Sequence, residues 1–151
     1  MTDQVVEAVR AVCQELPEVV EEPAWVGTRW RVRGRTFAHV LEITNAWPPA
    51  YAKASGLDGA TVLMFRSSGD ELDVLRHADL PYFAPPWRAD EAGLVVGDDL
   101  DAEEIGELVT ISYTCQAPKA LREQVERHSP DGWLRFARSR DRPPGSSRRR
   151  R

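Results

Sequence analysis

The sequence predicts a single domain of the α+β class, and three observations support this prediction. Residues 25–43 contain two runs rich in β-branched and aromatic residues on either side of Arg33 and Gly34, which is the pattern of a β-hairpin. Residues 2–16 and 102–115 carry apolar side chains at helical spacing. The chain has 151 residues, of which 42% are hydrophobic and 29% are charged, as in an ordinary globular domain.

The first predicted helix spans residues 2–16, and Pro17 prevents it from continuing. The acidic residues that follow, Glu18, Glu21 and Glu22, are interpreted as a solvated connection to the hairpin. This interpretation places no strand before the hairpin.

The hairpin is the central structural prediction. Gly34 can adopt the positive φ that a tight turn requires. Side chains alternate between the two faces of a strand, so Trp30 and Val32 are expected to share one face of the first run. In the second run the same alternation places Phe37 and His39 on one face, with His39 buried or half-buried.

The rest of the chain is expected to form short strands and helices separated by loops. Asp101 followed by Glu104 is a capping-box pattern, which marks the start of a helix. Pro118 suits the first turn of another helix. The predicted elements are a loop at 44–59 with one helical turn at 50–55, a strand at 60–66, a helix at 68–77, a proline-rich loop at 80–87, a strand at 94–96, and helices at 102–115 and 119–128.

The net charge of −4 is unevenly distributed along the chain. Residues 135–151 hold eight arginines and one aspartate, so the remainder is strongly acidic. We expect a folded domain over residues 1–136 and a disordered arginine-rich tail at 137–151. The terminal run 148–151 could contact nucleic acid or fold back onto the acidic body. Such a division differs from the uniformly basic surface of a typical DNA-binding protein.

Composition also indicates the compartment. No apolar segment approaches the roughly 20 residues that span a bilayer, and the first residues lack the basic start of a signal peptide. Cys13 and Cys115 are far apart in the sequence and are expected to be buried thiols rather than a disulfide. We therefore expect a cytoplasmic protein without membrane contact. We expect a monomer and leave a dimer open.

Several short segments, taken in order, resemble the MmcQ/YjbR family over about residues 5–125. These segments are 16–17 (LP), 30–38 (WRVRGRTFA), 81–82 (PY), 105–113 (IGELVTISY) and 117–119 (APK). The resemblance implies a frataxin-like fold of the CyaY type, in which helices pack on one face of an antiparallel sheet. It also implies DNA binding, because members are described from their shape as DNA-binding proteins with a double-wing motif. It transfers no catalytic residues.

The hairpin provides the main functional hypothesis, which is contact with DNA or another polyanion. A two-stranded ribbon fits the major groove, and arginine side chains recognise phosphates and guanine edges. The alternative is a solvated strand whose charges prevent edge-to-edge pairing. The residues that carry the hypothesis are Arg29, Trp30, Arg31, Arg33 and Arg35.

The proline-rich loop provides a second hypothesis, a binding site for a small molecule or a protein. Tyr82, Phe83 and Trp87 could line such a pocket, or they could cover an edge of the core. A third group is acidic and could hold a hard cation, although capping of the helix at 102–115 already explains much of it. Its members are Asp98, Asp99, Asp101, Glu103, Glu104 and Glu107. We predict no metal site.

The sequence does not favour catalysis. His39, His77 and His128 lie on different predicted elements and lack the spacing of metal ligands. The chain contains no nucleophile elbow, no glycine-rich phosphate loop and no Cys-x-x-Cys pair. We therefore expect a binding domain without a cofactor rather than an enzyme.

Overall fold

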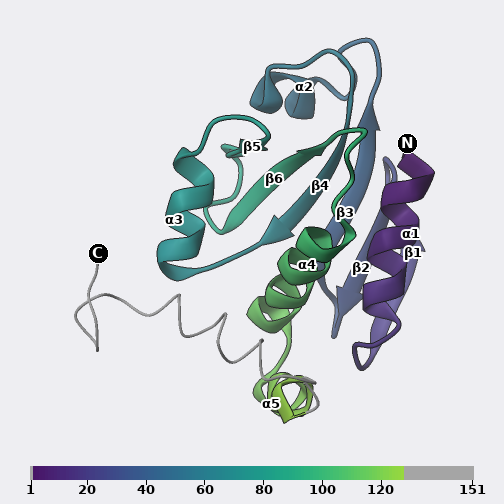
Figure 1. The fold of residues 1–151 in the computed structure, drawn as a ribbon, viewed down its shortest axis with the longest axis vertical. Helices are drawn as coiled ribbons and strands as arrows, with labels where there is room; N and C mark the ends of the chain where they lie inside the picture. The colour runs from purple at the N-terminus through teal and green to yellow at the C-terminus, as the bar shows by residue number, and fades with distance from the viewer. Residues whose placement is uncertain (1, 128–151) are drawn as a thin grey trace.

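A computed structural model describes residues 2–127 and contains one six-stranded antiparallel sheet with five helices (Figure 1). The strands, in sheet order, are β1 (Val19–Pro23), β2 (Thr28–Val32), β3 (Arg35–Ile43), β4 (Ala60–Arg66), β6 (Glu91–Val96) and β5 (Tyr82–Phe83). The helices are α1 (Thr2–Cys13), α2 (Pro49–Ser55), α3 (Gly69–His77), α4 (Ala102–Gln116) and α5 (Lys119–Arg127). The predicted tail at 137–151 and the proposed contacts of residues 148–151 lie outside the described residues.

The main core lies between one face of the sheet and the helices α1 and α4. Val5 and Val9 of α1 and Val109 of α4 are fully buried there against Trp30 and Leu63 of the sheet. These observations confirm the predicted α+β class with helices on an antiparallel sheet. No helix among residues 2–127 is long and apolar enough to cross a membrane.

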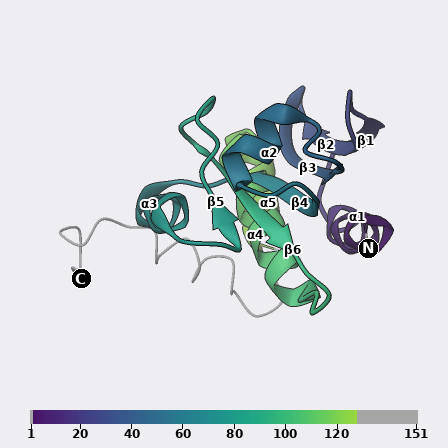
Figure 2. The ribbon, with the colours of Figure 1, turned by 90° about the horizontal axis from the view of Figure 1, so that it is seen from above.

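The short helix α2 adds a second, smaller layer on the opposite face of the sheet (Figure 2). Its Tyr51 and Ala52 pack against Leu41, Ile43 and Met64, which point away from α1 and α4. The sheet is therefore covered on both faces near the end where α2 lies, a detail that the prediction of helices on one face did not include.

A strand and a helix start that were predicted from an apolar run and a capping pattern are found at the predicted residues. The strand expected at 60–66 matches β4. The N-cap of α4 is also confirmed, because the Asp101 carboxylate accepts bonds from the backbone N–H groups of Glu103 and Glu104 at 3.0 and 3.1 Å. By contrast, Ser68 makes no side-chain capping bond to α3.

The segment predicted to be a solvated connection is instead the edge strand β1. It pairs with β2 so that Glu21 lies opposite Trp30 and Glu22 lies opposite Arg29. The prediction was wrong because this strand is held by cross-strand polar contacts as well as by backbone pairing, and it lacks an alternating apolar pattern.

A β-bulge interrupts the hairpin at Phe37. Trp30 pairs with Ala38, and the next residue, Arg31, pairs with Thr36, so Phe37 is an extra residue in β3. The bulge places Phe37 in the main core, whereas His39 faces the α2 side and contacts Tyr51. The predicted common face of Phe37 and His39 was therefore wrong, because strict alternation does not hold across a bulge.

The backbone at the bulge obtains its hydrogen bonds from α4. The hydroxyl of Ser112, which is fully buried, donates to the Phe37 carbonyl at 2.5 Å and accepts from the Arg66 backbone N–H at 2.7 Å. The side-chain amide of Gln116 donates to the Thr36 carbonyl at 3.0 Å. One helix thus ties together the beginning of β3 and the end of β4.

We predict that Ser112→Ala lowers the free energy of unfolding by about 1–3 kcal/mol, because it leaves two buried backbone groups without partners. Ser67→Ala is a matched control. Ser67 is also buried, at 4% exposure, but its hydroxyl has no partner among residues 2–127, so its removal should cost little. Urea unfolding of both variants measures the difference. Equal losses would show that the Ser112 bonds contribute no specific stability.

Candidate nucleic-acid interface

Three of the four hairpin arginines are paired with glutamates of the segment that leads into and forms β1. Arg29 donates from Nε to Glu22 Oε2 at 2.7 Å, and Nη1 of Arg31 lies 3.3 Å from the same oxygen. Arg33 forms a two-bond pair with Glu18 at 2.6 and 3.0 Å. The hairpin therefore does not present four unpaired guanidinium groups.

The arginines lower the pKa values of Glu18 and Glu22. Hydrogen bonds from Arg33 hold the pKa of Glu18 below its ordinary value, and bonds from Arg29 and then Arg31 do the same for Glu22. Both carboxylates consequently remain charged at neutral pH. The pairs are partly solvated, which makes each of them weak.

Trp30 does not belong to the predicted contact surface. Its side chain is 1% exposed and lies in the main core, on the α1 side of the sheet. Its indole Nε1 donates to Glu21 at 3.0 Å, and Glu21 also binds Arg10 of α1 at 2.9 and 2.6 Å. Trp30 is therefore part of the core and is linked to α1 through Glu21. The interface prediction was wrong for Trp30.

Arg35 differs from the other hairpin arginines. It is exposed and forms no ion pair within residues 2–127. It borders a polar pocket of about 450 Å³ at the end of the sheet nearest the hairpin turn. Besides Gly34, the pocket is lined by Arg35, Thr36, Arg66, Arg88, Asp90 and Gln116.

Arg66 and Arg88 also line this pocket, although they were not among the residues predicted from the sequence. Arg66 ends β4, and its Nη1 lies 3.2 Å from Asp90 Oδ2. Arg88 precedes β6, and its Nε lies 3.8 Å from Glu91 Oε1. Antiparallel pairing of β4 with β3 and β6 brings these residues beside Arg35. The sequence offered one indication of this site, because Arg66 lies at the end of the strand predicted at 60–66.

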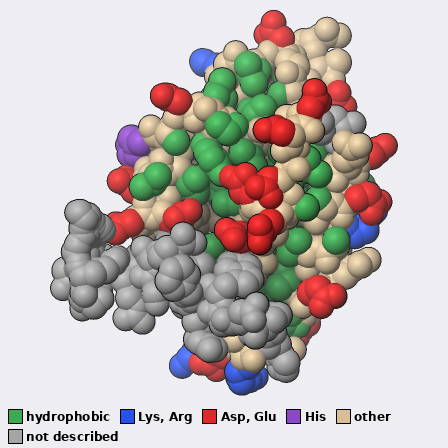
Figure 3. All heavy atoms as spheres, in the orientation of Figure 1, with side chains coloured by type: hydrophobic (Ala, Val, Ile, Leu, Met, Phe, Trp, Pro, Cys, Tyr) green, Lys and Arg blue, Asp and Glu red, His purple; other side chains and the backbone are tan. Residues whose placement is uncertain are grey.

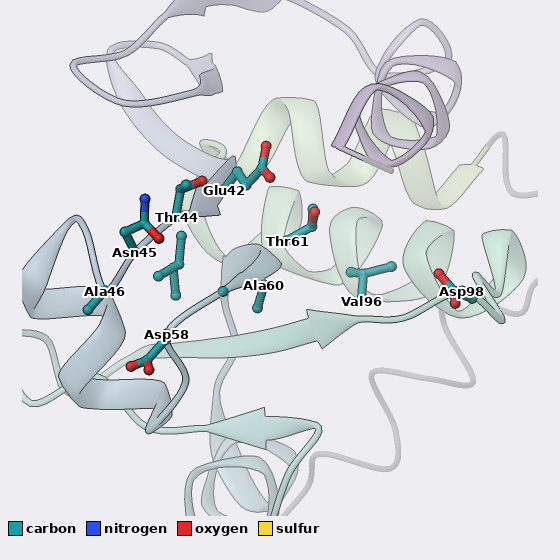
Figure 4. A pocket seen from close by; sticks show the side chains of 11 residues that line it. Glu42, Thr44, Asn45, Ala46, Asp58, Ala60, Thr61, Val96 and Asp98 are labelled. Atoms are coloured by element: carbon teal, nitrogen blue, oxygen red, sulfur yellow. The ribbon is translucent and has the colours of Figure 1, made fainter.

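The opposite end of the sheet is acidic. A shallow pocket of about 710 Å³ there is lined in part by Glu42, Asp58 and Asp98, whose carboxylates come from different segments (Figure 4). Asp and Glu side chains are also spread over the face that carries α1 and α4 (Figure 3). No group of three or more candidate metal ligands occurs among residues 2–127.

The aromatic residues of the proline-rich loop do not line one pocket. The Tyr82 hydroxyl donates to Glu104 of α4. Phe83 is 5% exposed and lies on Gly93, where an added Cβ would be 2.3 Å from the phenyl ring. Trp87 is 42% exposed and contacts the ring of Tyr51 at 5.0 Å between centroids. The predicted small-molecule or protein pocket is therefore not formed by these three side chains.

His39, a titratable residue outside the interface, packs against Tyr51 of α2. Its Nε2 donates to the Val26 carbonyl at 2.5 Å, and burial lowers its pKa below the ordinary value. Cys13 and Cys115 form no disulfide within residues 2–127, and burial raises the pKa of Cys13 to about 12, which makes it a poor nucleophile.

Most of the described sequence matches a known family. The family model described as YjbR matches residues 14–115. The chain belongs to the YjbR family. The MmcQ/YjbR resemblance seen in the sequence is thereby confirmed.

A solved structure is similar to this YjbR protein, whereas no curated protein matches it. The similar structure is protein DR2400 of Deinococcus radiodurans, which contains a DUF419 domain. The two chains are 21% identical, the match covers 80% of this chain and 86% of the other, and the TM-score is 0.54. At this identity the comparison supports the shared fold.

We predict that His39 makes the stability of the domain depend on pH below about 6.5. The unfolded chain binds a proton at this histidine at a pH where the folded chain does not, so stability falls as the pH decreases from about 6.5 toward the lowered folded pKa. The slope is at most about 1.4 kcal/mol per pH unit for one proton.

His39→Gln keeps a donor near the Val26 carbonyl and removes the titration. Urea unfolding at several pH values between about 5 and 7.5 should therefore show a shallower pH dependence for this variant than for the parent. Identical profiles would show that another group controls the acid sensitivity.

Proposed function

We propose that this YjbR protein is a non-enzymatic DNA-binding domain that contacts phosphates with the hairpin end of its sheet. We call this surface the basic end and define it by Arg29, Arg31, Arg33, Arg35, Arg66 and Arg88. The observation that carries the proposal is the separation of charge along the strands, with Arg35, Arg66 and Arg88 at the hairpin end and Glu42, Asp58 and Asp98 at the other end.

The ion pairs within the basic end reduce its charge without removing it. Four carboxylates, those of Glu18, Glu22, Asp90 and Glu91, accompany the six arginines. A guanidinium has five N–H donors, and Arg29 and Arg31 share one carboxylate, so donors remain for a phosphate. Partly solvated pairs are weak, so a ligand phosphate can compete with them.

The same pairs limit the expected affinity. An arginine that exchanges a glutamate for a phosphate gains less than an unpaired arginine does, because one charge partner replaces another. Arg35 forms no ion pair among the described residues, and the carboxylate nearest to Arg88 is 3.8 Å away. We therefore expect most of the salt dependence to come from these two arginines.

We predict that the double variant Arg35→Ala, Arg88→Ala weakens binding to duplex DNA and flattens its salt dependence. The log–log slope changes by about 0.9 for each phosphate that the protein no longer neutralises, so the expected change is roughly 1.8. Fluorescence anisotropy with a labelled duplex between about 50 and 200 mM salt measures it. Lys53→Ala is the control, because Lys53 is an exposed cation on α2, at the other end of the sheet. An unchanged slope in the double variant would exclude this surface.

We predict that Glu22→Gln strengthens DNA binding at low salt and makes the salt slope steeper. This change frees Arg29 and Arg31 from their common carboxylate while the side chain keeps its size. Glu42→Gln removes the same charge at the acidic end and serves as the control. If both variants gain equally, only net charge matters, and if Glu22→Gln gains nothing, the paired arginines do not contact the ligand.

A further inference from the structure

The pocket beside Arg35 differs from the rest of the basic end because it is concave and almost entirely polar. Arg35 comes from the start of β3, Arg66 from the end of β4 and Arg88 from the loop before β6. We infer that this pocket binds a phosphate monoester, the doubly charged group found at the end of a phosphorylated nucleic-acid strand and in a free nucleotide. The inference rests on the proposed function for the first of these sources.

The charge of the pocket matches this ligand. Three guanidinium groups and the Asp90 carboxylate leave an excess of two positive charges among the lining side chains. A phosphate monoester carries about −1.5 to −2 at pH 7, which would neutralise this excess. A phosphodiester within a strand carries a single negative charge and would leave part of the excess in place. The pocket therefore favours a strand end over an internal phosphate.

The position of Arg35 is fixed by its neighbours before any ligand arrives. Nη2 of Arg31 donates to the Gly34 carbonyl at 2.6 Å, and Gln116 donates to the Thr36 carbonyl at 3.0 Å. Gly34 has a φ of 80°, which closes the turn in a conformation that other residues rarely adopt. The backbone on both sides of Arg35 is thus held while its side chain stays exposed, which lowers the entropic cost of binding.

The other two arginines have complementary roles. The side chain of Arg66 is only 11% exposed and is oriented by Asp90, whose own side chain is 50% exposed. Arg66 therefore forms a partly buried wall at which a charge interaction is screened less than at the surface. Arg88 is exposed, and its contact with Glu91 is long at 3.8 Å, so it can turn toward a bound phosphate. Guanidinium groups bind phosphate oxygens through pairs of parallel hydrogen bonds.

The test compares two short single strands of the same sequence that carry a label at the 3′ end and either a phosphate or a hydroxyl at the 5′ end. With the full chain, the phosphorylated strand should bind about tenfold more tightly, since hydrogen bonds to charged groups are among the stronger ones. Arg35→Gln should abolish this preference, and Lys53→Gln should retain it. A second arm titrates inorganic phosphate by calorimetry, where the parent should bind weakly and Arg35→Gln should not bind.

Each outcome separates the pocket from the proposed function. If both strands bind equally and inorganic phosphate gives no heat, the pocket inference is overturned while DNA binding stands. If inorganic phosphate binds in an Arg35-dependent way but neither these strands nor the labelled duplex binds, the pocket holds a small phosphate ester and the proposed function fails. A preference for the 5′-phosphate that survives Arg35→Gln would place the site elsewhere and overturn the inference. Circular dichroism of the variants verifies that they remain folded.

Discussion

The hydrogen bonds of Ser112 are the constraint on which the basic end of this domain depends. The hydroxyl of Ser112 joins the Phe37 carbonyl in the β3 bulge to the Arg66 backbone N–H at the end of β4. The ladder between β3 and β4 does not reach these two groups, because its pairs run only from Ala38 to Ile43 on the β3 side. A buried backbone group without a partner costs more than a typical hydrogen bond contributes, so the helix side chain makes this irregular geometry possible.

This arrangement links the core to the surface. The bulge turns Phe37 into the main core, where its ring contacts Tyr113 edge-to-face at 5.3 Å. Arg35 and Thr36, which precede Phe37, lie outside the regular ladder between β3 and β4. The Thr36 carbonyl accepts a hydrogen bond from Gln116 instead. Arg35 therefore lies beside Arg66 at the end of the sheet because α4 accommodates the extra residue. Packing of one aromatic ring and placement of one surface cation are consequences of the same bulge.

Local signals in the sequence determine some elements of this fold, and pairing between distant segments determines the others. The limits of β4 and the Asp101 cap of α4 follow from apolar runs and capping chemistry within a few residues. β1 was missed because it lacks an alternating apolar pattern and is held to β2, which follows it in the chain, by backbone pairing and charge pairs. The arginine hypothesis found Arg35, but Arg66 and Arg88 join it only through the order of strands in the sheet, which short-range patterns do not specify.

The protein has a net charge of −4, yet a pocket lined by acidic side chains and a pocket lined by arginines lie at opposite ends of the sheet. This separation makes the proposed binding of a polyanion compatible with the negative net charge. Repulsion between the carboxylates at the Glu42 end and a nucleic acid disfavours approach from that side, while the basic end attracts it. Glu18 and Glu22 then have a specific effect, because they hold the hairpin arginines in place and lower the attraction that these arginines would otherwise exert on any anion. Arg35 forms no ion pair among residues 2–127, and under the proposed function we expect it and the pocket behind it to be the part of the basic end that attracts an anion most. A surface built in this way discriminates by local geometry, since only a ligand that places a doubly charged group in the pocket gains the full electrostatic benefit.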